Sequence, residues 1–295
     1  MTECSVLDAL IAKNGSETLC GNPVRNRGQQ FSALVITSIV LAFGFIIVRF
    51  TYRFLVGNYD YDDWFVLAAF ISSTLSAALS IFGTIANGLG RDVWTLEPNE
   101  VTNMLKYFYA IASLYFLQVA LTKISLLFFY MRIFSDIQRL LWSLLVFVAF
   151  WGLLYIFLFV FQCYPISLFW MRWDGEHRGR CLSLNILTNT QSSINIALDF
   201  GVLSIALWKI RVLHVSWTQK AGIVFMFCIG TLVTLVTIIR ISIINDFAAT
   251  TTNPSWDFVD ACVWTALDVN ISIICLCLPV TRQLILWTSW EIFQR

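Results

Sequence analysis

The chain has 295 residues, of which 58% are hydrophobic and only 13% are charged, and its formal net charge is +1. This balance excludes an ordinary soluble domain and provides no basic surface for binding nucleic acid. Because the chain has only two histidines, it also offers little for a metal centre. We therefore expect an all-α, multi-pass membrane protein whose main partner is the lipid bilayer.

Residues 1–30 are largely polar and lack the basic-then-apolar pattern of a cleaved signal peptide. We therefore expect an N-terminal tail here, with the first membrane helix acting as the signal anchor. The tail contains Cys4, Cys20 and the sequon Asn14-Gly15-Ser16. Asn14 is thus a candidate glycosylation site if the tail reaches the lumen.

Residues 31–290 are predicted to form seven transmembrane helices, because long apolar runs alternate with short polar connections. Asp62 and Asp63 stand at the start of the second helix, where exposed amide groups and the helix dipole favour negative charge, so we interpret them as capping residues. Residues 291–295 are expected to be a short cytoplasmic stub. In order, the predicted helices cover about Phe31–Leu55, Trp64–Ala86, Lys106–Phe134, Leu140–Cys163, Ile186–Trp208, Ala221–Ile244 and Phe258–Leu286.

The third predicted helix is the most informative stretch of the chain. From Tyr107 to Met131 its single charged residue is Lys123. This lysine lies about eight residues, or roughly 12 Å, from the expected cytoplasmic end of the helix. Its amine can therefore extend toward the lipid head groups, pair with a carboxylate or contact a ligand.

Lys123, Asp199, Arg240 and Asp268 form the predicted intramembrane polar network. Each would be costly if it faced lipid, so we expect these side chains to face the bundle interior and to pair with one another. Such a network either fixes the packing of the helices or contacts a ligand. We expect an acid on the fifth or seventh helix to neutralise Arg240, with Asp260 nearest to it in depth.

The sidedness of the bundle depends on its cysteines, because the basic residues divide almost evenly between the two sides. With the N-terminus outside, Cys4, Cys20, Cys163 and Cys181 would all lie on the oxidising side. The sequon in the tail agrees with this orientation. We expect a multi-pass protein of the plasma membrane with its N-terminus outside.

Four outer cysteines allow three pairings, of which Cys163–Cys181 is favoured because it is local and already bracketed by a turn at Pro165. The loop between these cysteines also contributes two tryptophans to a predicted pocket that faces outward and accepts an apolar small molecule. The predicted lining of this pocket is Trp170, Trp173, Trp256 and Trp264.

Several intramembrane chemistries find no support in the sequence. A retinal Schiff base needs a lysine in the seventh helix, but no lysine follows Lys220. A zinc hydrolase needs several inward-facing ligands, whereas His177 and His214 both lie in predicted loops. An aspartyl dyad of Asp199 and Asp268 stays open as an alternative, although no motif accompanies it. We therefore expect no enzyme activity, no metal and no cofactor.

The runs YDYDDWFVLAAF, NGLGRDVW, ALTKISLLFFYMRIF and DVNISIICLCLPVTRQL resemble the fungal integral-membrane family called rhodopsin domain-containing. That family includes Pth-type receptor-like proteins and membrane proteins found beside mycotoxin gene clusters. The resemblance covers about Phe31–Trp287 and implies a seven-helix, GPCR-like bundle. Pth-type receptors carry an extracellular domain with eight cysteines, whereas the tail of this chain has only Cys4 and Cys20.

Together, the residues and the resemblance predict an orphan seven-helix receptor-like protein that senses a small apolar or extracellular ligand and has a possible cytoplasmic signalling partner. Two alternatives stay open. One is a transporter or exporter of small molecules, although no internal repeat or broken helix is visible in the sequence. The other is a non-signalling membrane component of a secondary-metabolite pathway.

Overall fold

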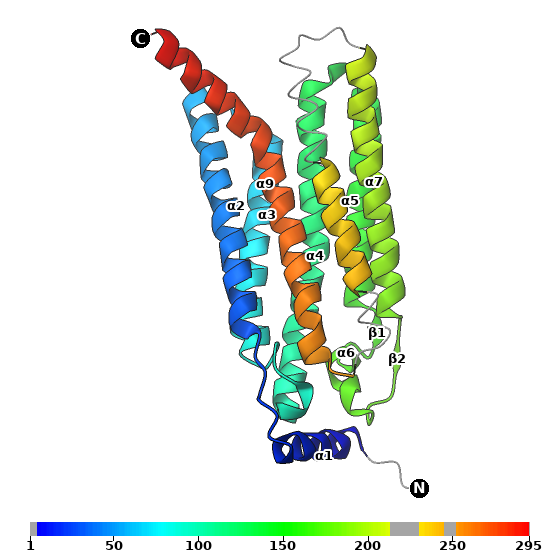
Figure 1. Cartoon of the computed structure of the whole chain (residues 1–295). Coiled ribbons are helices and arrows are strands. Elements are labelled where there is room, and N and C mark those ends of the chain that lie inside the picture. The colour runs from blue at the N-terminus through cyan, green and yellow to red at the C-terminus, as the bar shows by residue number, and fades with distance from the viewer. Residues whose placement is uncertain (1–4, 213–229, 245–251, 295) are drawn as a thin grey trace.

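The computed structural model describes residues 5–212, 230–244 and 252–294 as an elongated bundle of long helices that run side by side (Figure 1). The helix α4 occupies a central position, since it contacts α3, α5 and α9, while α2 packs against α9. The long helices are α2 (Gly28–Val56), α3 (Tyr61–Ala78), α4 (Pro98–Ile133), α5 (Gln138–Val160), α7 (Leu184–Val212) and α9 (Pro254–Gln294), and the segment Gly230–Ile244 is also helical.

Within the described part of the chain, five helices are long and apolar enough to cross a membrane: Gly28–Val56, Tyr61–Ile85, Pro98–Ile133, Ser135–Val160 and Pro254–Leu284. The prediction of an all-α, multi-pass membrane protein is therefore confirmed. The first half of α7 is rich in Asn, Thr, Gln and Ser, and this helix is not among the five. The sixth predicted helix, Ala221–Ile244, lies partly outside the described residues.

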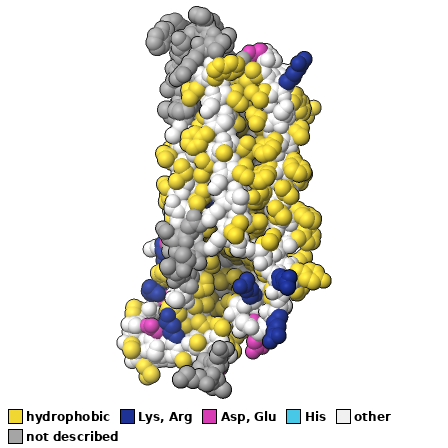
Figure 2. Space-filling model, turned by 90° about the vertical axis from the view of Figure 1, so that its right-hand side faces the viewer, with side chains coloured by type: hydrophobic (Ala, Val, Ile, Leu, Met, Phe, Trp, Pro, Cys, Tyr) yellow, Lys and Arg dark blue, Asp and Glu magenta, His cyan; other side chains and the backbone are white. Residues whose placement is uncertain are grey.

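Hydrophobic side chains cover the long wall of the bundle in Figure 2, and most of the Lys and Arg side chains visible on this face gather near the end where α1 lies. This distribution is the one expected of a protein whose walls contact lipid tails. Inside, aromatic and small side chains from α2, α3, α4, α5 and α9 interlock around Phe116, Phe159 and Ile273. Since lipid is as apolar as these side chains, close packing and interhelical hydrogen bonds hold the helices together.

Helix α4 begins eight residues before the predicted start at Lys106. Pro98 occupies its first turn, where a missing amide hydrogen costs nothing, and Glu97 and Glu100 form a capping box around the helix start. Helix α3 continues through a π-helical stretch, η1 (Leu79–Ile85), and the chain then turns at Gly88 and Gly90, whose φ angles are positive.

The N-terminal tail, expected to be an irregular polar segment, contains a helix, α1 (Val6–Leu19). The side chain of Ser5 caps its first turn by accepting a hydrogen bond from the amide of Asp8. The helix lies across the end of the bundle (Figure 1), against the short helices η2 (Val93–Thr95) and η4 (Arg172–Asp174). The ammonium group of Lys13 stacks on the ring of Trp94, 3.8 Å from its centroid.

Candidate functional site

The main cavity is a partly open pocket, with about 1080 Å³ of empty space that includes solvent at its mouth, between α2, α3, α4, α5, α7, α9 and the segment Gly230–Ile244. It follows α9 from Phe258 to Asn270, a rise of about 18 Å along the helix axis. Its wall is largely apolar and includes the rings of Phe108, Phe116 and Phe159. A largely apolar pocket with a few polar groups is typical of small-molecule binding sites.

One part of the cavity wall is a set of hydrogen-bonded polar side chains. Asn270 donates to Ser38 Oγ at 3.0 Å and accepts from Ser73 Oγ at 3.0 Å. On the neighbouring helices, Gln118 Nε2 donates to Ser76 Oγ at 2.8 Å. These bonds connect α2, α3, α4 and α9 and fix the rotation of each helix about its own axis.

Arg240 is the charged residue among those that line this cavity, and its side chain is buried. Its Nε donates to Thr265 Oγ1 at 3.0 Å, and its Nη1 lies 3.4 Å from Ser192 Oγ. The guanidinium group sits over the ring of Tyr115, 4.0 Å from the centroid. This contact is a cation–π interaction that partly stabilises the buried charge.

The prediction that an acid pairs directly with Arg240 is wrong for the described residues, where no carboxylate lies within ion-pair distance of it. Tyr115 links Arg240 to Asp268 instead, because its ring lies under the guanidinium group while its hydroxyl donates to Asp268 Oδ2 at 3.0 Å. Thr237 donates to the other carboxylate oxygen at 2.9 Å. Asp260 is engaged elsewhere, by Arg27 at 2.7 and 3.0 Å.

Lys123 and Asp199 form an ion pair beside a second, partly open cavity, which lies between α4, α7, α9 and the helical segment at Gly230. The lysine therefore pairs with a carboxylate rather than extending to the head groups. Asp199 Oδ2 is buried and has no hydrogen-bond partner among the described residues. Since Asp199 pairs with Lys123 while Asp268 binds Tyr115 and Thr237, the two aspartates do not share a proton as a dyad in this arrangement.

A second charged cluster, formed by Arg49, Arg53, Asp62 and Asp63, was not predicted as a site. All four side chains are at most 2% exposed. Arg49 pairs with Asp62 and, through Nε at 2.7 Å, with Asp63, while Arg53 Nε lies 3.0 Å from Asp63. Of the two aspartates predicted to cap α3, Asp63 does so, since it accepts a hydrogen bond from the amide of Asp60 at 3.1 Å, whereas the Asp62 carboxylate pairs with Arg49 and Arg53.

This four-charge cluster connects four helices. Arg49 Nη1 donates to the backbone carbonyl of Leu276 on α9 at 2.6 Å, and Ser125 on α4 donates to the carbonyl of Asp62 at 2.9 Å. Arg132, also on α4, pairs with Asp60 at the start of α3. The available signal in the sequence was the spacing of two arginines four residues apart on α2, one helical turn, facing adjacent aspartates after a short turn.

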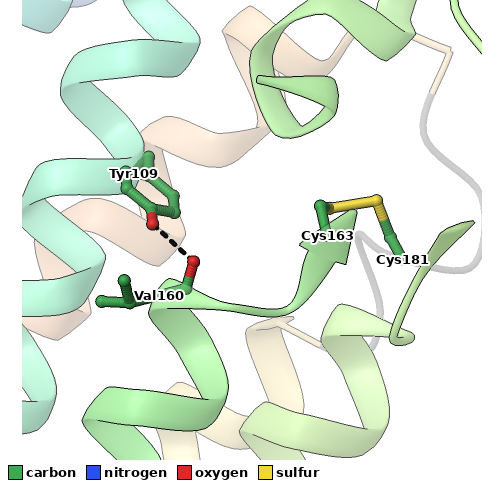
Figure 3. Close-up of a disulfide and its surroundings, with 4 residues drawn as sticks. All are labelled: Tyr109, Val160, Cys163 and Cys181. Atoms are coloured by element: carbon green, nitrogen blue, oxygen red, sulfur yellow. Dashed lines mark hydrogen bonds between the residues drawn. A yellow bond between two sulfur atoms is a disulfide. The ribbon is translucent and has the colours of Figure 1, made fainter. Parts of the chain in front are cut away.

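The predicted disulfide between Cys163 and Cys181 is present (Figure 3). The two cysteines are paired in register between the antiparallel strands β1 (Cys163–Tyr164) and β2 (Arg180–Cys181). Beside them, the hydroxyl of Tyr109 donates to the carbonyl of Val160 at 2.7 Å and ties α4 to the end of α5. Of the other outer cysteines, Cys20 is free and exposed, and Cys4 lies outside the described residues.

The four predicted pocket tryptophans do not line the main cavity, whose aromatic wall is made of phenylalanines and Tyr115. Trp170 packs edge-on against Tyr109, and Trp173 donates to Thr102 Oγ1 at 3.1 Å. Trp256 lies under the guanidinium groups of two arginines, and Trp264 is half-buried on α9. The polar indole nitrogen and the flat ring place tryptophan at contacts with cations and hydroxyls near the bundle end.

At that end, the N-terminal segment, the turn after α3 and the start of α9 are joined by a polar clasp made of Arg25, Arg27, Asp92, Asn253 and Asp260. Arg25 pairs with Asp92 at 2.6 Å, and Asn253 donates to the same carboxylate at 2.7 Å. The hydrogen bond to Asp92 raises the pKa of the Arg25 guanidinium. The clasp holds the ends of α2, α3 and α9 together beside the cavity.

Asn14, the predicted glycosylation site, lies on α1 with an exposed side chain. Its carbonyl accepts a hydrogen bond from Thr18, whereas no hydrogen bond of its amide side chain is among the contacts of the described residues. The acceptor nitrogen is therefore accessible at the surface, and its modification stays a prediction.

Comparison with known proteins gives one family and several relatives. The family model described as "Fungal rhodopsin domain" matches residues 48–287. Satratoxin biosynthesis SC1 cluster protein 4 of Stachybotrys chartarum is 27% identical over 191 residues, which are 61% of this chain and 68% of the relative. Wortmanamides biosynthesis cluster protein C of Talaromyces wortmannii is 26% identical over 263 residues, which are 85% of this chain and 69% of the relative.

A SAT4 family membrane protein of Emericella nidulans is 26% identical over 199 residues, covering 65% of this chain and 49% of the relative. No solved structure matches the chain. Two of these three relatives carry names that refer to the biosynthesis of small molecules.

Proposed function

Because the chain belongs to the fungal rhodopsin domain family, we propose that it is a seven-helix, receptor-like protein of the plasma membrane that binds a small, largely apolar molecule. The resemblance noted in the sequence is confirmed by the family match, which covers residues 48–287. In this proposal α7 and the segment Gly230–Ile244 belong to two further membrane-spanning helices, in addition to the five that meet the criteria of length and apolarity.

The observation that carries the proposal is the main cavity, with its apolar wall and its few hydrogen-bonding groups. It lies toward the end of the bundle where α1 and the disulfide-bonded loop are found, which is the outer end if the N-terminus is outside. The names of the relatives support a link to secondary metabolism. The proposed function involves neither catalysis nor a cofactor.

The test is ligand-dependent thermal stability of the purified protein in lipid nanodiscs, screened with a library of apolar molecules of a few hundred daltons. We expect a subset to raise the unfolding temperature. Ala266→Leu, which fills part of the cavity, should abolish these shifts. Ala33→Leu adds the same atoms at an exposed position of α2 and should leave the ligand-induced shifts in unfolding temperature unchanged. Shifts that survive Ala266→Leu unchanged would place binding elsewhere.

A transporter is the second candidate, and the second cavity favours it. Asp199 is ion-paired, and its buried second oxygen has no hydrogen-bond partner within the described part of the chain; this is the kind of intramembrane group that proton-coupled transporters use. Uptake of a stabilising molecule into vesicles that contain the protein, lost on Asp199→Asn, would favour transport. Stabilisation without uptake would favour a receptor or a non-signalling component of the pathway.

A further inference from the structure

We propose that the ligand of the main cavity is an apolar molecule with one carboxylate group, and that Arg240 binds this carboxylate. The inference rests on the proposed function, because it names the class of molecule that the same cavity takes. It depends on the position of a buried cation in a cavity whose other described lining residues are uncharged.

The guanidinium group of Arg240 keeps its charge when buried and carries five hydrogen-bond donors. Nε is satisfied by Thr265, whose own hydroxyl donates to the carbonyl of Ala261. Nη1 has one long contact, at 3.4 Å to Ser192, and Nη2 has no acceptor among the described residues. The edge formed by the two terminal nitrogens is therefore available for an acceptor from the ligand.

The nearby carboxylate of Asp268 does not fill this role. One of its oxygens accepts from Tyr115 and the other from Thr237, and neither oxygen lies within ion-pair distance of Arg240. A buried cation whose nearest described contacts are two hydroxyls and an aromatic face lacks the partner that burial normally requires. A ligand that brings its own anion supplies it.

A carboxylate fits this site better than a phosphate. The two terminal nitrogens of a guanidinium group match the two oxygens of a carboxylate in a bidentate pair. One cation balances one negative charge, whereas a phosphate monoester with two charges would leave one without a counter-charge. The remaining wall accepts an apolar body, with Thr188 and Asn185 of α7 as further polar contacts.

Such an acid could come from membrane lipid, as a long-chain fatty acid, or from the aqueous phase, as a compact aromatic acid. Two pairs of probes distinguish these sources: oleic acid with oleyl alcohol, and 2-naphthoic acid with 2-naphthylmethanol. Binding is measured by the thermal shift and by titration calorimetry on the full chain in nanodiscs. We expect at least one acid to bind about tenfold or more tightly than its alcohol, since charge-assisted hydrogen bonds are the strong ones.

Arg240→Gln should remove the preference for the acid while leaving the affinity for the alcohol within about twofold. Arg139→Gln removes the same charge at an exposed position and should leave the preference intact. Equal affinity of acids and alcohols for the unmodified protein would overturn the carboxylate inference and leave the proposed function standing. This comparison uses only the unmodified protein, so it does not depend on the folding of any variant. Failure of all four probes to bind would overturn the carboxylate inference as well, whereas the proposed function would be overturned only if no molecule of the library in the thermal-shift screen bound.

Discussion

Arg49, Arg53, Asp62 and Asp63 bring four formal charges together in the protein interior. Each arginine contacts both carboxylates, so the cluster is neutral and every charge has two opposite neighbours. A network of this kind gains little over apolar packing as long as it is complete, because desolvation offsets the attraction between the charges. Its effect on stability appears when one member is removed.

We expect Asp63→Asn to lower the free energy of unfolding by about 3–5 kcal/mol, because the amide keeps the volume but leaves two buried guanidinium groups facing one carboxylate. The measurement is an unfolding titration in mixed micelles. Asp174→Asn is the matched control, since Asp174 pairs with His177 in a loop and should change stability by less than about 1 kcal/mol. Equal losses for the two variants would contradict this account of the cluster.

At the scale of elements, the paired strands β1 and β2 close the longest loop between described helices over the end of the bundle, with the disulfide in register between them. The cysteines are 18 residues apart. Cross-linking at this separation reduces the conformational entropy of the unfolded loop, so the bond stabilises the fold chiefly by restricting the unfolded state.

Cys181→Ser should therefore lower the free energy of unfolding by about 2–4 kcal/mol. The same unfolding titration measures this loss, with and without a reductant. The reductant should lower the stability of the unmodified protein but leave that of the Cys181→Ser variant unchanged. Cys20→Ser, at an exposed free thiol, should behave like the unmodified protein. A protein whose stability is indifferent to both the reductant and the Cys181 substitution would refute the prediction.

The positions of the long helices could be predicted because each crossing needs an apolar run of about 20 residues. Helix starts were less predictable, since Pro98 and its capping box begin α4 within a stretch that contains polar residues. The helix α1 was missed because it has no buried residue and no apolar run of its own, and its position depends on contacts such as that of Lys13 with Trp94.

The types of residue that form the candidate site could be predicted from the sequence, but the contacts between these residues could be predicted much less well. Charged residues within apolar helices stand out in the sequence, and because contact with lipid is costly they are expected to pair. Lys123 and Asp199 do form such a pair. Which acid pairs with which base depends on the rotation and depth of each helix, and these would have to be known to within the width of one side chain. A single tyrosine, Tyr115, takes the place at which an ion pair to Arg240 was expected, and no pattern in the sequence marks it.

The whole molecule has two different ends. One carries α1, the polar clasp and the disulfide-bonded loop, and the other carries the partners of Asp60 and the end of α9 (Figure 1). The proposed function requires the first end to be outside, because the main cavity lies toward it. This orientation can be tested independently of any ligand.

We expect Asn14 to be glycosylated in a eukaryotic host, since it lies exposed on α1 at the end assigned to the outside. Endoglycosidase treatment should increase electrophoretic mobility, and Asn14→Gln should remove that response. Asn22→Gln, at an asparagine outside any sequon, should retain it. An N-terminal epitope that antibodies reach only from the cytosolic side would reverse the orientation.

Arg49 also has a mechanical consequence through its hydrogen bond to the carbonyl of Leu276. Pro279 lies inside α9, and a proline interrupts the helical hydrogen bonds in the turn before it, so that the helix can bend there. Leu276 lies in that turn. Because the same guanidinium group pairs with Asp62 and Asp63, a change in the bend of α9 that displaces Leu276 would either move α2 and α3 with it or break the hydrogen bond between Arg49 and the carbonyl. The charged cluster thus restrains the bend in α9 near Pro279, and it couples the angle of α9 to the first turn of α3.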